Sequence, residues 1–447
     1  MKNFLLVVFC TIILFSPLQF AQNVTLLGSL DPYPGSAYAN IWGYAEGGRE
    51  YALMGVTGGT TIIDVTVPSI PVEVAFIPGP LAPPYEWREI KTHLNYAYVV
   101  SEGTGSGAGM QIIDLSNLPD TATLAATYNT TFTRAHEIFI ADGFANVVGT
   151  SQGGMHILDL SNPTNPVQVG FYGASNYIHD VHVWNDTAYA SSADTYDLVD
   201  LSSKANPQLI SQSAALPGIY AHSGWLTEDK RYFIACEEFN VVDLTVWDLE
   251  DRSSWDLVIP SWQMAGTSPI HNIFILGNYA HISYYKDGYV VLDISDPTNP
   301  VFAAQYDTYP SSGGGTYDGA WGVDPYLPSG NSIVSDMSTG LYICRFEPPI
   351  TSVEDNQNIP LDFLLAQNYP NPFNPSTRIK FSLPENDFVN LEVYSMLGEK
   401  VTQLVNEIKP AGEYEIDFDA TGFNSGIYLA RLTAGNRSSI IKMSLVK

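Results

Sequence analysis

Four of the eight histidines stand at nearly regular intervals in the middle of the chain, separated by 43, 43 and 49 residues. They are His136, His179, His222 and His271. Imidazole binds transition metals and transfers protons near neutral pH. Because these residues are distant in sequence, only a fold that repeats with the same period can bring them together.

Acidic, amide and aromatic side chains occupy neighbouring positions of the same period. One interpretation is a small-molecule site at the mouth of a channel. Its residues are Trp42, Arg88, Glu89, Glu137, Asp180, Asn272 and Trp321. A second interpretation is a single divalent metal ion held by the four histidines. In a third, each histidine only links its unit to the backbone of a neighbouring unit. The residues leave all three open.

A sequence repeat supplies the required period. Seven units place an equivalent residue at the end of an apolar strand, at intervals of 50, 45, 41, 48, 45 and 51 residues. These residues are Asp64, Asp114, Asp159, Asp200, Asp248, Asp293 and Cys344. The clearest copies, 153–172 and 287–306, continue through a Pro/Asn turn into another strand. Two further short strands precede each copy. Four strands repeated seven times predict an all-β protein with a seven-bladed β-propeller.

This fold sorts the residues onto two faces. The innermost strands begin on one face, called the top here, where the four histidines gather with second-strand ends such as Glu102 and Glu238. The aspartate turns lie on the other face, where turn formation alone explains them. We expect residues 24–30 to lend a strand to the first blade and close the ring. Cys236 and Cys344 are expected to be buried free thiols.

The composition and the two ends of the chain limit where the protein can act and what it can bind. Lys2 and a short apolar run predict a secretory signal peptide over residues 1–21. The propeller is expected over 22–349 and a linker over 350–366. No segment of the mature chain is long and apolar enough to be a transmembrane helix. The net charge of −28, with only 19 Lys and Arg residues, argues against nucleic-acid binding.

The sequence offers no catalytic motif in a suitable setting. It contains no H-E-x-x-H, no P-loop and no dinucleotide-binding glycine pattern, and its one G-x-S-x-G match, residues 149–153, stands between two predicted strands and not before a helix. A binding or interaction module is therefore favoured, and whether the protein is an enzyme stays open. The alternative is a metal-dependent hydrolase or oxidase, in which a divalent ion activates water beside a carboxylate at the top of the channel.

Two longer runs carry a family resemblance. WGYAEGGREYALMGVTGGTTIIDVT (42–66) and WREIKTHLNYAYVVSE (87–102) resemble the choice-of-anchor B family of exported bacterial proteins, and the repeated unit resembles the LVIVD repeat. The resemblance covers residues 35–347. It implies the propeller architecture and no particular reaction.

The last segment reads as a separate module. Residues 367–447 alternate strands with glycine turns and predict a small Ig-like β-sandwich. The pattern is similar to the C-terminal sorting domain of type IX secretion in the Bacteroidetes. The matching residues are Tyr369, Pro370, Asn371, Pro372, Phe373, Gly398, Gly412, Gly426, Tyr428 and Lys447. This resemblance implies export across both membranes, docking on the secretion machinery, and a final place at the cell surface or outside the cell. A glycan or surface protein is the expected partner of the propeller.

Overall fold

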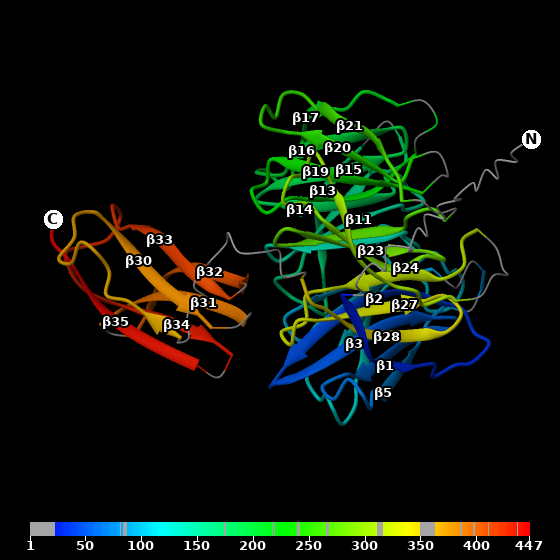
Figure 1. The fold of residues 1–447 in the computed structure, drawn as a ribbon, viewed down its shortest axis with the longest axis horizontal. Helices are drawn as coiled ribbons and strands as arrows, with labels where there is room; N and C mark the ends of the chain where they lie inside the picture. Colours follow the sequence, from blue (N-terminus) through cyan, green and yellow to red (C-terminus); the bar gives the residue numbers. More distant parts are fainter. Residues whose placement is uncertain are drawn as a thin grey trace, which may run out of the picture.

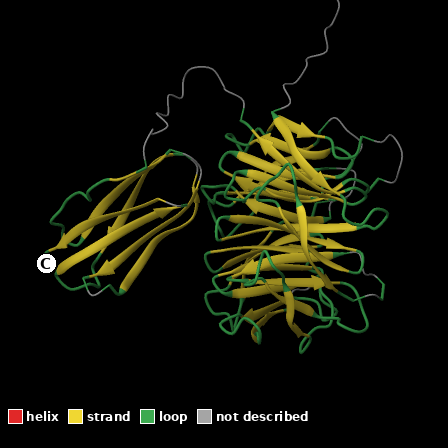
Figure 2. Ribbon diagram, turned by 90° about the horizontal axis from the view of Figure 1, so that it is seen from below, coloured by secondary structure: helices red, strands yellow, loops and turns green. Residues whose placement is uncertain are grey.

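The computed structural model describes residues 23–80, 82–83, 87–173, 176–216, 218, 220–238, 242–264, 268–310, 316–348, 363–384, 387–396, 398–409, 411–435 and 437–447. The predicted signal peptide, and the predicted linker up to residue 362, lie outside the described residues. Throughout the described part, the regular elements are strands, with no helix among them (Figure 2). That part therefore also holds no helix long and apolar enough to cross a membrane.

Seven antiparallel sheets of four strands confirm the predicted propeller. The first three blades are β2 (Tyr38–Glu46), β3 (Arg49–Val56), β4 (Gly59–Asp64), β5 (Val72–Pro78); β6 (Arg88–His93), β7 (Tyr96–Ser101), β8 (Met110–Asp114), β9 (Thr123–Tyr128); and β10 (Glu137–Ala141), β11 (Phe144–Val148), β12 (Met155–Asp159), β13 (Val167–Tyr172). The next three are β14 (Asp180–Trp184), β15 (Thr187–Ser192), β16 (Thr195–Asp200), β17 (Gln208–Gln212); β18 (Ala221–Leu226), β19 (Tyr232–Glu237), β20 (Leu244–Asp248), β21 (Asp256–Trp262); and β22 (Asn272–Leu276), β23 (Tyr279–Tyr284), β24 (Gly288–Asp293), β25 (Val301–Tyr306).

The ring is closed by the N-terminal strand, in the last blade. The seventh blade contributes only β26 (Ala320–Asp324), β27 (Asn331–Asp336) and β28 (Gly340–Phe346) from its own repeat. Strand β1 (Val24–Leu30) pairs antiparallel with β28 as the fourth strand, although it precedes the first blade (Figure 1). The expectation that residues 24–30 join the first blade is therefore wrong. The first blade has its own outer strand, β5, and it is β28 that would otherwise present an unpaired edge.

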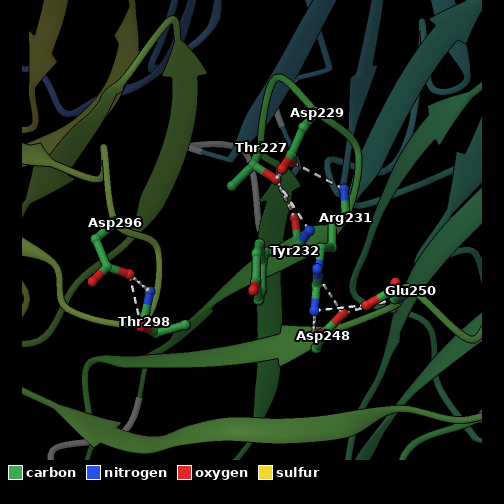
Figure 3. Close-up of polar contacts among 8 residues, drawn as sticks. All are labelled: Thr227, Asp229, Arg231, Tyr232, Asp248, Glu250, Asp296 and Thr298. Carbon is green, nitrogen blue, oxygen red and sulfur yellow. Dashed lines mark hydrogen bonds and ion pairs between the residues drawn. The ribbon is translucent and has the colours of Figure 1, made fainter.

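The aspartates that mark the repeat form the turns of the bottom face. In six blades the carboxylate accepts the backbone N–H two residues later, at 2.7–2.9 Å. In the fifth blade, Arg231 also donates to Asp248 and forms an ion pair with Glu250 (Figure 3). In nearby turns, the carboxylates of Asp229 and Asp296 accept hydrogen bonds from threonine hydroxyls two residues away. Turn formation accounts for these residues.

Outer strands carry a small residue where the turn of the next blade approaches. A Cβ atom on Gly170 in β13 would lie 1.7 Å from the carbonyl oxygen of Lys204, and one on Gly28 would lie 1.9 Å from that of Pro68. At the equivalent position of β17, the Ser211 hydroxyl donates to the carbonyl of Arg252 at 2.9 Å. The blades therefore interlock through backbone at their bottom edges.

The two cysteines are buried and free, as expected. Cys236 lies in β19 and Cys344 in β28, two blades apart. Apolar neighbours surround both thiols, and burial raises the pKa of Cys344 to about 12. They are core residues rather than reactive ones.

The C-terminal residues form two facing sheets. One contains β29 (Leu364–Leu365), β30 (Ser376–Leu383) and β33 (Gly412–Asp419). The other contains β31 (Asp387–Ser395), β32 (Lys400–Lys409), β34 (Gly426–Ala434) and β35 (Arg437–Leu445). Both sheets contribute to one apolar core.

The sorting-motif residues divide between the core and the surface of this sandwich. Phe373 is buried in the core, whereas Tyr369 is 82% exposed. Peptide bonds 369–370 and 371–372, which precede Pro370 and Pro372, are cis. Gly398 adopts a positive φ of 81°, as a turn requires. The Lys447 ammonium donates to the carbonyl of Thr421 at 2.6 Å, and the Tyr428 hydroxyl donates to that of Asn424 at 2.8 Å.

Candidate functional site

In five of the seven blades, one ring stands at the top of the channel, at the start of the innermost strand. His136, His179 and His271 directly precede β10, β14 and β22. His222 lies in β18 and Trp321 in β26, each inside a register shift where the strand bulges. A bulge adds one residue against the neighbouring strand and re-aims its side chain, so these two residues point the same way as the other three.

These side chains form an arc of closely spaced rings, each tilted against the next, around the mouth. Ring centroids are 4.1 Å apart for His136 and His179, 4.2 Å for His179 and His222, and 4.8 Å for His222 and His271. Trp321 follows at 4.4 Å from His271, and Trp87 at 6.5 Å from Trp321. The structure thus brings the four predicted histidines together, and Trp321 and Trp87 continue the same arc.

Some of the histidines are linked to the backbone of the next blade. The Nδ1 atom of His179 lies 3.2 Å from the carbonyl oxygen of His222, and that of His271 lies 2.6 Å from the carbonyl of Trp321. A carbonyl only accepts, so Nδ1 carries the proton in both rings. In the neutral ring, Nε2 then keeps a free lone pair.

Two carboxylates from second-strand ends reach the arc. Glu102 meets His136, with 2.6 Å between Oε1 and Nδ1. Burial alone would lower the pKa of His136, but the hydrogen bond and charge of Glu102 outweigh it and the pKa is raised. Glu238 places Oε2 3.6 Å from Nε2 of His222. The hydroxyl of Tyr285 donates to its other oxygen at 2.7 Å.

Burial keeps the other three imidazoles neutral. It lowers the pKa of His222 and of His271 to about 3, and holds that of His179 well below its ordinary value. Neighbouring imidazoles add to the effect, since a positive charge on one disfavours a charge on the next. The arc therefore combines one histidine whose pKa is raised with three whose pKa values are lowered.

A layer of buried charged and amide groups lies beneath the arc. Lys91 pairs with Glu137 at 3.3 Å, and the amide of Asn40 donates to Glu89. Burial raises the pKa of Asp180 to about 8 and also raises that of Glu89. Three acids around one lysine leave excess negative charge, which protonation relieves.

The channel is blocked below this layer. Its cavity has a volume of about 20 Å³, which is room for a single water molecule. Aromatic side chains fill the rest: Trp225 lies 4.1 Å from His182 and 4.9 Å from Phe274 between ring centroids. At this depth the channel therefore has no room for anything larger than a water molecule.

The residues predicted for a ligand site fall into three places. Trp321 belongs to the arc. Glu89, Glu137, Asp180 and Asn272 belong to the buried layer under it. The remaining two, Trp42 and Arg88, lie elsewhere.

Trp42 lies one layer deeper, with the Lys91 ammonium 4.6 Å from its ring. Arg88 turns away from the channel and donates to the carbonyls of Val56 and Pro80, both at 3.2 Å. It is 1% exposed, so its role in the structure is to join the first two blades.

Sequence reasoning did not single out Trp87, Lys91 or Tyr285. Trp87 directly precedes β6, one position before the strand start that the repeat suggests, and β6 pairs with β7 without the register shift found at His222 and Trp321. Lys91 is two residues beyond Glu89 on the same strand, so strand alternation alone places both in the channel. No sequence signal ties Tyr285 to Glu238, which comes from the preceding blade.

Two known families match parts of the chain. Residues 88–130, 134–173 and 270–308 match the LVIVD repeat, and residues 367–447 match the secretion system C-terminal sorting domain. The chain thus carries LVIVD repeats in its propeller and a type IX secretion sorting domain, which directs export to the cell surface or the extracellular space. No curated protein matches the sequence.

Solved structures with similar folds are distant in sequence. A putative 6-phosphogluconolactonase from Bacteroides fragilis has 9% identity and a TM-score of 0.50, and the match covers 87% of this chain and 99% of that one. A second, from Bacteroides uniformis, has 11% identity and a TM-score of 0.50, over 85% and 99%. A protein from Lactobacillus plantarum has 10% identity and a TM-score of 0.50, over 80% and 95%. At these identities the similarity shows the fold alone.

Proposed function

We propose that this exported propeller is a binding module that captures a neutral glycan at the mouth of its channel. The observation that carries the proposal is the arc of rings from Trp87 to His136, which stacks above a blocked channel. The exposed parts of Trp87 and His179, with Tyr177 at the rim, offer apolar surface to the C–H faces of a sugar, and carboxylates accept hydrogen bonds from its hydroxyls.

The rim of the mouth suits this ligand class. Tyr177 and Tyr317 are about two-fifths exposed beside the arc, 6.3 Å from His179 and 5.3 Å from Tyr285 between ring centroids. Glu102 and Glu238 make the mouth acidic, which disfavours anionic ligands. Delivery to the surface by the sorting domain would bring this mouth to extracellular glycans.

A glycan array probed with the labelled full-length chain tests the proposal. A Trp87→Ala/Tyr177→Ala double variant removes apolar surface at the mouth. We expect it to lose binding to neutral oligosaccharides by about 10-fold or more. Trp184→Ala is the control, because Trp184 is exposed at the far end of β14. Equal binding by the double variant, or no binding by the wild type, would contradict the proposal.

A metal-dependent hydrolase or oxidase is the second candidate. Its support is the approach of His179, His222 and Glu238, whose ligating atoms lie within 4.8 Å of one another. The His136–Glu102 pair beside them, in which Glu102 raises the pKa of His136, offers a proton donor next to such a site. Hydrolysis of ester and phosphoester substrates by the metal-loaded chain, lost in His136→Gln, tests this candidate.

A further inference from the structure

We infer that His179, His222 and Glu238 form a binding site for one divalent transition-metal ion, with Zn²⁺ the best match. The inference deepens the proposed function, because the ion would lie at the same mouth. Two imidazoles and one carboxylate are ligands that zinc accepts, whereas Ca²⁺ and Mg²⁺ require mostly oxygen ligands.

The spacing of the ligating atoms is close to what zinc needs. All three lie within 4.8 Å of one another. Bond lengths of about 2.0–2.1 Å to tetrahedral zinc place neighbouring ligand atoms about 3.4 Å apart. The pair formed by His222 Nε2 and Glu238 Oε2 is already at 3.6 Å. A small rotation of the partly exposed His179 ring would complete the set.

His222 has a buried ring whose Nε2 atom has no hydrogen-bond partner among the described residues. The ring is 1% exposed, and the nearest oxygen to Nε2, Oε2 of Glu238, lies 3.6 Å away. Leaving a buried polar group unpaired costs about 1–3 kcal/mol. A metal ion on Nε2 would satisfy the ring at the one atom that faces a carboxylate.

The surroundings of the other two ligands orient them for metal binding. The Nδ1–H of His179 is held by the carbonyl of His222, which leaves Nε2 free. The hydroxyl of Tyr285 holds Oε1 of Glu238 and leaves Oε2 toward His222. Hydrogen bonds of this kind fix the rotamer and tautomer of metal ligands.

The neighbouring histidines belong to other contacts. His136 is paired with Glu102, and His271 donates to Trp321. The site therefore has three protein ligands and faces the mouth through the partly exposed Glu238 and His179. A fourth position open to water or to a ligand is the pattern of functional rather than purely structural zinc sites.

The experiment uses the full-length chain without a histidine tag, dialysed against a chelator and titrated with Zn²⁺ in a calorimeter. We expect one ion per chain. His222→Gln and Glu238→Gln keep side-chain size and should each weaken binding by about 100-fold or more. Tyr285→Phe removes only the positioning bond and should weaken it by about 10-fold. His281→Gln is the matched control, since His281 is equally buried but bonded to Tyr289 at 2.6 Å.

Binding that is absent from the wild type, or unchanged in both Gln variants, would overturn the inference. If His222→Gln does not fold, Glu238→Gln and the visible spectrum of the Co²⁺-loaded wild type decide: an intense tetrahedral band supports the site, and a weak octahedral one contradicts it. Glycan binding on the array that persists after chelation would support the binding module and show that it does not need the metal. Metal binding without any glycan binding would support the metal site and contradict the glycan-binding module.

Discussion

The Nδ1 atom of His179 lies 3.2 Å from the backbone carbonyl oxygen of His222, the residue at the same position of the next blade. His271 and Trp321 repeat this relationship one blade further, at 2.6 Å. One imidazole thus ties two blades together through Nδ1 and presents Nε2 to the mouth. The structural interpretation of the histidines and the ligand interpretation therefore apply to different atoms of the same ring.

Removal of His271 separates these two roles. His271→Ala deletes a buried ring and its link to the seventh blade, so we expect the free energy of unfolding to fall by about 2 kcal/mol. Zn²⁺ binding should persist, because His271 is outside the three-ligand group. Urea unfolding and calorimetry measure the two effects. His93→Ala, at a half-buried ring on a strand end, should change stability by less than about 0.5 kcal/mol. A stable His271→Ala variant that no longer binds metal would contradict this division.

The buried acids predict a pH dependence of stability. The folded-state pKa of Asp180 is raised to about 8, first by burial and then by the charge of Glu137. Its contribution to stability is full below the ordinary pKa of about 4 and is lost as the pH rises to 8, because the folded state holds a proton that the unfolded state releases. Asp180→Asn cannot ionise, so it should exceed wild type by about 1 kcal/mol or more at pH 8 and match it near pH 4.

Urea unfolding at pH 4.5, 6 and 8 measures this difference. The control is Asp159→Asn on the bottom face. Backbone hydrogen bonding from Ser161 lowers the pKa of Asp159, so its contribution has the opposite sign and is lost as the pH falls. A gap between Asp180→Asn and wild type that does not widen with pH would show that Asp180 is ionised in the folded protein.

The close backbone contact between neighbouring blades predicts that one added methyl group at this contact destabilises the propeller. In Gly170→Ala the new Cβ would meet the carbonyl oxygen of Lys204 at 1.7 Å, and both partners are backbone. The fourth blade must then shift, so we expect a loss of about 2 kcal/mol or more in unfolding free energy. Gly173→Ala, three residues on, meets only a side-chain carbon of Phe171 at 3.5 Å and should be neutral. Similar melting temperatures for the two variants would refute the interlocking.

The sequence was sufficient for the architecture because each blade repeats the same local signals. Apolar strands and aspartate turns recur at a fixed period, and every one of those turns makes the same backbone hydrogen bond. Ring closure was misassigned because β1 and β28 pair across the whole propeller, and strand pairing at that separation leaves no local signal.

The sequence predicted that the four histidines meet, but it did not predict how the groups beneath them are arranged. The period of the histidines predicted their meeting. The second blade lacks the register shift of the fifth and seventh blades, however, and so Trp87 rather than Arg88 reaches the arc. The layer of Glu89, Lys91 and Asp180 depends on how far each side chain extends along the channel, which residue type and spacing do not specify. Partners from different blades, such as Tyr285 and Glu238, are visible only in three dimensions.

Two motif residues of the sorting domain, four positions apart, are expected to serve different purposes, one in folding and the other in delivery. Phe373 packs in the sandwich core, 6.0 Å from Phe418 between ring centroids, so Phe373→Ala should cost about 3 kcal/mol and expose residues 367–447 to limited proteolysis. Tyr369 is 82% exposed, and its backbone is fixed by two hydrogen bonds with Arg378 at 2.9 and 3.0 Å. An aromatic ring held in solvent by the backbone is suited to contact a partner.

Tyr369→Ala should therefore leave protease resistance unchanged while lowering the fraction of the chain that reaches the cell surface. Ile440→Ala is the matched control, because Ile440 is also an exposed apolar residue of the sandwich but lies on β35, outside the motif. Surface labelling of cells that express each variant measures delivery, and protease digestion of the purified chains measures folding. If Tyr369→Ala is delivered as well as Ile440→Ala, the exposed ring has no part in docking, and recognition must then rest on the other motif residues, such as Lys447.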